Sequence, residues 1–294
     1  MTALDKRVEI NLERILFATD FSFCSARAHP YVLSLARHYA STVRLIHVVS
    51  IAAALKGPGA RICARNLRED GEDRLNALSA EFASSDIKVE ISLCEGLDTA
   101  SEIRQAAAEM SADLIVIGTS GSHGLERLAF GSTAEALIHR ADCPVLTVGP
   151  NVQPPGTGRI FQNIVYATDF TPAAANAAIA AFSVAKEYGA HIYLCHVDPP
   201  PDKYRPIDTK ERNEMFNAAV EKLIPEIARD RCEPECVLEH GYAADGIRLL
   251  AYRVNADLLV LGARRASHWF ATIKAGIAFQ VIRAVSCPVL TIRG

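Results

Sequence analysis

The sequence predicts an α/β protein of two tandem doubly wound domains, each a five-stranded, mainly parallel sheet with helices on both faces. Three observations support this prediction. The chain repeats itself once, short β-rich apolar runs alternate with helical stretches, and those runs lack the polar alternation of a half-exposed strand. A run such as "LIVI" at 114–117 is expected to be buried on both faces, which is typical of a parallel sheet between helices.

The repeat predicts where the domains lie. "RILFATDF" at 14–21 returns as "NIVYATDF" 149 residues later, and "CPVLTV" at 143–148 returns as "CPVLTI" 144 residues later. The smaller second offset means that the second copy is five residues shorter. We therefore expect domains at 1–150 and 160–294, joined by a Pro/Gly-rich linker at 151–159.

The elements of the first copy are expected in strict alternation. The predicted strands are 14–19, 43–49, 87–94, 113–117 and 144–148, and the predicted helices are 22–40, 66–84, 99–110 and 132–141. Thr99 and Glu102 have the spacing of a capping box at the start of the third helix. The second copy is expected to repeat this order. Ligands of such a sheet bind beyond the carboxyl ends of its strands.

Composition excludes several classes of protein. Half of the 294 residues are hydrophobic and 22% are charged, which favours a packed core over disorder. The net charge of −3 argues against nucleic acid as the main partner. We expect a cytoplasmic protein with no membrane partner, because neither a signal peptide nor a membrane-spanning run is evident. The eight cysteines are scattered, which indicates reduced and mostly buried thiols rather than metal ligands.

The stretch "GTSGSHGLERLAFGST" at 118–133 is the first candidate site. Gly118 and Gly121 are expected to allow positive φ and close backbone approach. Gly131, Ser132 and Thr133 open a helix whose free N–H groups and hydroxyls suit a phosphate. A plain turn with a serine cap is the equal alternative. The missing Gly-Lys-Ser/Thr element excludes a Walker loop, and the position after the fourth strand excludes the Rossmann fingerprint.

Asp20 is the second candidate, because it follows the first strand in "ATDFS". Its carboxylate could accept hydrogen bonds from a nucleoside or help hold a metal ion on phosphates. Capping of the next helix beside Ser22 is an equally common role. His47 and His196 lie at equivalent strand ends and are expected to be structural.

These motifs together resemble the universal stress protein family. "ATDFS", "LIHVV", the spacing G-x2-G-x9-G-S and the closing "CPVLTV" carry the resemblance, which covers the chain twice as in tandem-domain members. The resemblance implies a Rossmann-like fold of the adenine-nucleotide α-hydrolase type and an ATP molecule across the strand ends, with Mg held only through the phosphates. It also implies domain pairing through the closing strands and a homodimer.

The same resemblance implies a set of nucleotide-binding residues. Asp20 and the main chain of Val48 would take the adenine end, Gly118 and Thr119 would lie near the ribose, and a solvated His123 would lie within the loop. The full implied set is Ala18, Thr19, Asp20, Val48, Gly118, Thr119, Gly121, Ser122, His123, Gly131, Ser132 and Thr133.

The second copy departs from this motif. Arg265 aligns with Gly121, Ala275 with Gly131 and Ile277 with Thr133. We expect ordinary ATP binding to be lost there, although Asp169, Val197 and Gly262 persist. The open alternative is an anion site in which Arg264 and Arg265 replace backbone contacts.

The predicted function is therefore regulatory. The N-terminal domain would bind ATP in a stress response, and the C-terminal domain would be a degenerate scaffold. No catalytic residues are predicted, and Arg127 is the one candidate for assisting slow ATP hydrolysis. The alternatives are an adenylating enzyme, whose signature after the first strand is missing, and an interaction module without nucleotide.

Overall fold

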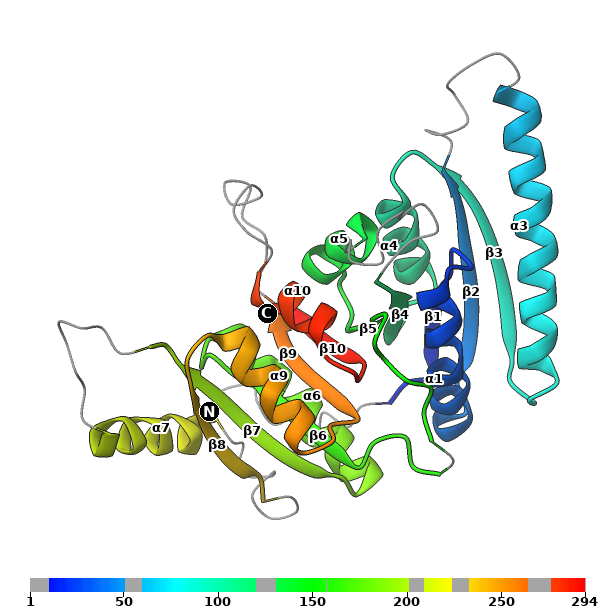
Figure 1. Ribbon diagram of the computed structural model, residues 1–294. Helices are drawn as coiled ribbons and strands as arrows, with labels where there is room; N and C mark the ends of the chain where they lie inside the picture. Colours follow the sequence, from blue (N-terminus) through cyan, green and yellow to red (C-terminus); the bar gives the residue numbers. More distant parts are fainter. Residues whose placement is uncertain are drawn as a thin grey trace, which may run out of the picture. The chain divides into compact units, whose positions relative to one another are not determined.

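The computed structural model describes residues 11–50, 60–119, 131–156, 158–200, 209–223, 233–263 and 276–293, with the backbone alone at 60–64 and 209. The chain divides into two compact units, Asn11–Pro155 and the unit that contains Gly156–Gly294. We call them the N-terminal and C-terminal domains and describe each by itself (Figure 1).

The N-terminal domain alternates strands and helices. Its elements are β1 (Arg14–Ala18), α1 (Phe23–Tyr39), β2 (Thr42–Ser50), α3 (Ala60–Ala83), β3 (Val89–Gly96), α4 (Thr99–Glu109), β4 (Leu114–Gly118), α5 (Ser132–Arg140) and β5 (Val145–Val148). Its strands are ordered β3-β2-β1-β4-β5, and every neighbouring pair is parallel.

The C-terminal domain repeats this plan. Its elements are β6 (Asn163–Ala167), α6 (Pro172–Tyr188), β7 (His191–Asp198), α7 (Thr209–Leu223), β8 (Glu235–His240), α9 (Ala243–Arg253), β9 (Leu258–Ala263), α10 (Ile277–Ala284) and β10 (Val289–Arg293). The strand order is β10-β9-β6-β7-β8, again with parallel neighbours. The predicted α/β fold class is thus confirmed.

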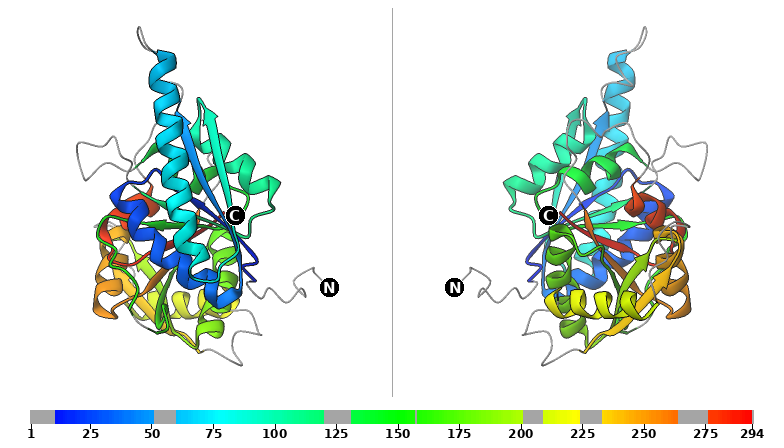
Figure 2. Two further views of the ribbon diagram at one scale, coloured as in Figure 1. Left: turned by 90° about the vertical axis from the view of Figure 1, so that its right-hand side faces the viewer. Right: turned by 90° about the vertical axis from the view of Figure 1, so that its left-hand side faces the viewer.

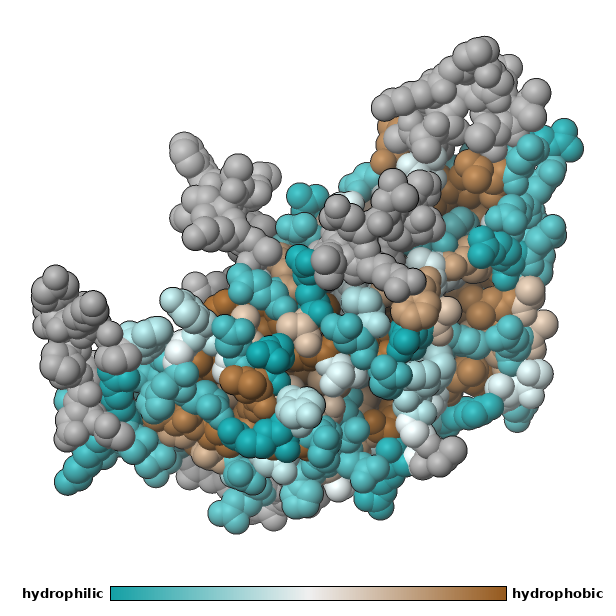
Figure 3. Space-filling view, viewed as in Figure 1, coloured by the Kyte–Doolittle hydropathy of each residue, from teal (hydrophilic) through white to brown (hydrophobic). Residues whose placement is uncertain are grey.

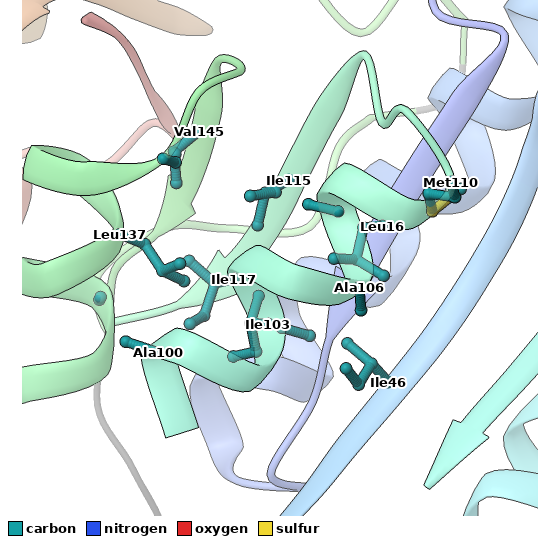
Figure 4. Close-up of a cluster of buried hydrophobic side chains, with 14 residues drawn as sticks. Leu16, Ile46, Ala100, Ile103, Ala106, Met110, Ile115, Ile117, Leu137 and Val145 are labelled. Atoms are coloured by element: carbon teal, nitrogen blue, oxygen red, sulfur yellow. The ribbon is translucent and has the colours of Figure 1, made fainter. Parts of the chain in front are cut away.

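Helices cover both faces of the N-terminal sheet. Figure 2 shows α3 and α4 on opposite sides of β2 and β3. The α4 side holds an apolar cluster in which Ile103 of α4 and Leu137 of α5 pack over Leu16, Ile115 and the strands around them (Figure 4). Each fully buried aliphatic side chain of this kind contributes about 1.5–3 kcal/mol to folding.

Two expectations about helix starts need correction. The third helix begins with Asp98 as its N-cap, and the Asp98 side chain accepts a hydrogen bond from the N–H of Ala100, so Thr99 is not the cap of a capping box. Asp98 is itself a strong capping residue one position earlier, and it takes that role. Helix α3 begins at Ala60 rather than near 66, directly after the Gly-Pro-Gly sequence at 57–59. No helix among the described residues is long and apolar enough to cross a membrane.

Candidate functional site

Both sheets have one topological switch point. In the N-terminal domain the chain leaves β1 toward β2 and leaves β4 toward β5, so β1 and β4 are the neighbours at which strand order reverses. A crevice outside the carboxyl ends forms at such a point. Register places Ala18 opposite Ile117, so the segments that follow β1 and β4 lie side by side. β6 and β9 are the equivalent pair in the C-terminal domain.

The turn after the first strand has the same geometry in both domains. Thr19 is buried, donates its N–H to Ile46 O at 2.9 Å, and accepts the N–H of Phe21 on its hydroxyl at 3.0 Å. Phe21 has a positive φ of 58°, which is unusual for a bulky residue. Thr168 and Phe170 repeat the side-chain bond at 3.0 Å with a φ of 57°. The turn is therefore a property of the fold in both copies.

The two histidines hold this turn in place. His47 Nδ1 lies 2.8 Å from Thr19 O, and its ring lies 4.9 Å from the Phe21 ring. His196 Nδ1 lies 2.8 Å from Thr168 O, with its ring 4.7 Å from that of Phe170. The structural role predicted for both histidines is confirmed.

Asp20 braces the start of α1. Its Oδ1 accepts the N–H of Ser22 at 3.0 Å and the hydroxyl of Ser25 at 2.7 Å. Ser22 is the N-cap, and its hydroxyl accepts the N–H of Ser25. Ser22 rather than Asp20 is therefore the helix cap, and the half-buried Asp20 carboxylate holds the capping serine and Ser25 at the carboxyl edge of the sheet.

Val48 presents main-chain polar groups at the same edge. The pairing of β1 with β2 ends at Ala18 and Ile46, and Thr19 N–H bonds to Ile46 O. Backbone groups two residues apart in a strand face the same side, so the N–H and C=O of Val48 face the edge beyond the end of β1. Val197 has the same position, because the pairing of β6 with β7 ends at Cys195.

Gly118 is required for helix packing rather than for a special backbone conformation. A Cβ at this position would lie 2.7 Å from Cys24 C and from Ser25 N, in the first turn of α1. Its φ is outside the left-handed region, contrary to the expectation of positive φ. Gly262 meets α6 in the same way, 2.5 Å from Ala173 O. The first glycine of the motif therefore serves the fold in both domains.

Gly131 brings the start of α5 onto the end of β4. Its N–H donates to Thr119 O at 2.6 Å, and a Cβ on it would lie 3.1 Å from the same oxygen. As the N-cap of α5 it makes no side-chain capping bond, so within the described residues the first-turn N–H groups of Ser132 and Thr133 have no side-chain cap acceptor. Ser132 is exposed and Thr133 is half-buried.

Thr119 adds a buried hydroxyl beside this helix start. It is 1% exposed, and within the described residues its Oγ1 has no hydrogen-bond partner. The structure thus brings Thr19, Asp20, Thr119 and Gly131 to the strand ends around one switch point. Gly121, Ser122 and His123 lie outside the described residues, as does Arg127.

The C-terminal domain has an open cavity of about 200 Å³ at its switch point. Three of the residues named from the sequence contribute to it, namely Asp169, Val197 and Gly262. Arg264 and Arg265 lie outside the described residues. The cavity is lined by Ala167, Thr168, Asp169, Ala174, Cys195, His196, Val197, Ala243, Ile247, Leu261, Gly262, Ile277 and Ala278.

Sequence reasoning did not identify Ala174, Ala243 or Ala278 as lining residues. Alanine carries no chemical signal of its own. The repeat would not have found these positions, because the aligned residues of the first copy, Ser25, Thr99 and Ala134, are not among its candidate site residues.

The buried titratable groups near this cavity are unsuited to acid–base chemistry. Burial raises the pKa of the Cys195 thiol to about 12, so the thiol stays protonated at neutral pH. Burial also raises the pKa of Tyr166 to about 12, and its hydroxyl donates to Ala174 O at 2.6 Å. Within the described residues, no group of His, Cys, Asp and Glu is placed to hold a metal ion. The six described cysteines are free thiols, and three of them are buried.

Comparison with known proteins gives one consistent result. The model of the universal stress protein family matches residues 11–149 and again residues 160–293. A universal stress protein of Methanocaldococcus jannaschii is 34% identical over 139 residues, which are 46% of this chain and 81% of the relative. One of Mycolicibacterium smegmatis is 23% identical over 288 residues, covering 95% of this chain and 96% of the relative.

A solved structure is similar over the same length. The crystal structure of a universal stress protein from Archaeoglobus fulgidus has a TM-score of 0.74 at 21% identity, covering 96% of this chain and 98% of that chain. At 21% identity this similarity shows the fold alone and says nothing about a ligand.

Proposed function

Because this chain belongs to the universal stress protein family, we propose that its N-terminal domain binds ATP at the β1/β4 switch point and acts as a regulatory protein of the stress response in the cytoplasm. The observation that carries the proposal is the start of α5. Its uncapped first turn, the hydroxyls of Ser132 and Thr133, and the close approach of Gly131 to Thr119 form a group of hydrogen-bond donors suited to phosphate.

The other residues of the edge have complementary chemistry. The Asp20 carboxylate accepts hydrogen bonds, and the Val48 main chain offers one donor and one acceptor, which suits a ribose or an adenine ring. Ala18, Thr19 and Gly118 shape the floor between them. Gly121, Ser122 and His123 would complete the phosphate side. We expect Mg²⁺ to be held by the phosphate oxygens rather than by side chains of this chain.

Titration of ATP–Mg into the full chain by isothermal calorimetry tests this function. We expect one ATP per chain. Gly131→Ala is expected to weaken binding by at least about tenfold, because its Cβ would approach Thr119 O to 3.1 Å and displace the helix start.

Gly276→Ala is the matched control. Gly276 is the N-cap of α10, and the one described atom within 4 Å of a Cβ there is Phe279 Cδ2, at 4.0 Å. We expect this variant to bind ATP as the unsubstituted chain does. Absence of ATP binding at millimolar concentration would overturn the proposal.

We also propose that the closing strands are used for pairing between domains and that the protein is a homodimer. β5 and β10 are each the last strand in the order of their own domain, and the last strand of a sheet is the position at which a further strand can be added. Light scattering coupled to size-exclusion chromatography tests the dimer, and a mass of one chain would contradict it.

A further inference from the structure

The outward face of α9 carries large apolar side chains that the C-terminal domain does not bury. The helix packs against β6, β7, β8 and α10, and it buries Ile247 and Leu250 among them. Tyr242 at its N-cap, Leu249 and Tyr252 are 74%, 51% and 78% exposed. Spacings of seven and three residues place these three side chains, which we call the α9 stripe, along one side of the helix. Figure 3 shows hydrophobic surface between hydrophilic residues over α9.

The matching helix of the N-terminal domain has no such stripe. The three positions align, in order, with Asp98, Gln105 and Ala108. Asp98 caps α4, and Gln105 bonds to Glu109 of the same helix at 2.9 Å. The fold therefore accepts a polar surface at this place and does not require the aromatic rings. Large apolar side chains gathered on an exposed face mark an interaction surface.

Two opposite charges lie on the same face of α9. Asp245 and Arg248 are exposed, and within the described residues neither has a hydrogen bond or an ion pair. Residues three apart are neighbours on a helix and could pair with each other. Both charges therefore remain available to a partner, as do the hydroxyls of Tyr242 and Tyr252.

The side chains of this face are arranged symmetrically about Ile247. Tyr242 and Tyr252 lie five residues before and after it, and Asp245 and Leu249 lie two residues before and after it. A contact between two identical copies across a twofold axis joins a surface to itself, so the surface must complement itself. An antiparallel pair of α9 helices with the axis at Ile247 would set Tyr242 of one copy against Tyr252 of the other.

The charges of the face satisfy the same requirement. In that pair Asp245 lies opposite Leu249 of the second copy, next to its Arg248. The symmetry makes this contact twice, so each acid meets a base and no like charges face each other. Charge complementarity of this kind selects the partner and fixes the register of a contact.

We propose that the face of α9 formed by the α9 stripe, Asp245 and Arg248 binds the same face of a second copy of this chain. The helix has 11 residues and is about 16 Å long, so the contact is smaller than the roughly 800 Å² per partner of a typical stable interface. We therefore expect weak association, with a dissociation constant of about 10–100 μM. The inference rests neither on ATP binding nor on pairing through the closing strands.

Sedimentation velocity of the full chain between about 1 and about 300 μM tests the proposal. We expect the mean mass of the unsubstituted chain to rise with concentration. The double variant Leu249→Gln/Tyr252→Ala gives α9 the residues of the aligned positions of α4. It should weaken this association by at least about tenfold, because it removes the apolar contact and leaves the buried side of the helix unchanged.

Met215→Gln is the matched control. Met215 of α7 is an apolar residue of the same domain and is 62% exposed, but it lies outside α9. We expect this variant to associate within about twofold of the unsubstituted chain.

Exchange of the two charges tests the antiparallel register. Asp245→Arg places like charges together across the pair and should weaken association by at least about threefold. Addition of Arg248→Asp to the same chain restores opposite charges and should restore association to within about twofold. Circular dichroism checks that each variant is folded.

The proposal separates cleanly from pairing through the closing strands, because every variant leaves β5 and β10 unchanged. If that pairing forms a dimer, α9 joins one dimer to another, and if it does not, α9 joins single chains. Equal masses of the unsubstituted chain and the double variant at every concentration would overturn the inference. An equal loss in Met215→Gln would also overturn it, as would a charge exchange that restores nothing.

Discussion

The start of α5 in the N-terminal domain and the start of α10 in the C-terminal domain differ, although the turns and glycines beneath them are the same. Thr19 and Thr168 bond to the next strand in the same way, and a Cβ on Gly118 or Gly262 would lie less than 3 Å from the first helix of its own domain, α1 or α6. The helix starts diverge, with Ser132 and Thr133 at α5 and Ile277 at α10. The comparison separates residues that the fold requires from residues that the fold leaves free to differ.

The largest expected effect on stability comes from the two glycines that the domains share. Gly118→Ala and Gly262→Ala should each lower the free energy of unfolding by about 1–3 kcal/mol, because the new Cβ meets backbone atoms at 2.7 and 2.5 Å. Urea denaturation followed by circular dichroism measures the change.

Gly156→Ala is the control for these glycines, since a Cβ there meets no atom of the described residues within 4 Å. Its effect should stay below about 0.5 kcal/mol. A large loss of stability from one substitution and none from the other would show that the two glycines do not have the same packing role.

Removal of the first helix cap should lower the free energy of unfolding by the same amount in each domain, and by less than the glycine substitutions do. Ser22 accepts the N–H of Ser25, and Thr171 accepts the N–H of Ala174, both at 3.4 Å. Ser22→Ala and Thr171→Ala should each cost about 1 kcal/mol of stability. Ser22→Asp keeps an acceptor and should recover most of the loss in the same urea experiment. Unequal losses would mean that the two turns are not equivalent.

Tyr166→Phe should cost about 1 kcal/mol in the C-terminal domain, because it removes the hydroxyl that donates to Ala174 O at 2.6 Å. The aligned residue of the N-terminal domain is Phe17, which has no such hydroxyl. The buried bond is thus a stabilising feature of one copy alone. An unchanged denaturation midpoint would contradict this assignment.

The smallest expected effect is a pH dependence confined to the N-terminal domain. Burial lowers the pKa of His29 below its usual value of 6.5, against an opposing attraction to Glu81. The unfolded chain therefore takes up this proton at higher pH than the folded chain, and the stability is lost as pH falls through about 6.5. Position 178 of the second copy aligns with His29 and is alanine.

His29→Gln should therefore flatten the dependence of the melting temperature on pH between about 7 and 5. Calorimetry of the variant and of the unsubstituted chain gives the comparison. A steeper dependence of the melting temperature on pH in the variant would contradict a lowered pKa of His29 in the folded chain.

The sequence was a good guide to the fold, and the reasons are physical. The strands β1 and β4 are buried on both faces, so they appear in the sequence as continuous apolar runs. The repeat shows the same run a second time, which supports each assignment. Helix α3 was predicted too short because residues 60–65 show no clear apolar period. The N-cap of α4 was misplaced because Asp98 and Thr99 are both good capping residues.

The candidate site was harder to predict. A glycine after a strand suits a ligand and a packed helix equally well, and only the contact of Gly118 with Cys24, far away in sequence, decides between them. The role of Asp20 was open for a similar reason, since its bonds to Ser22 and Ser25 are local and its position at the sheet edge is not. The cavity of the C-terminal domain is formed largely by alanines and aliphatic residues, which carry no chemical signal.

The close contact at Gly118 and Gly262 has a consequence for the history of a duplicated chain. A change at either glycine harms folding before it affects any ligand, so selection for a folded protein alone retains both. At the start of α10 the nearest described atom to a Cβ on Gly276 is Phe279 Cδ2, at 4.0 Å, so substitutions there need not disturb the packing of the domain. A second copy can therefore change the residues at this helix start without passing through an unstable ancestor.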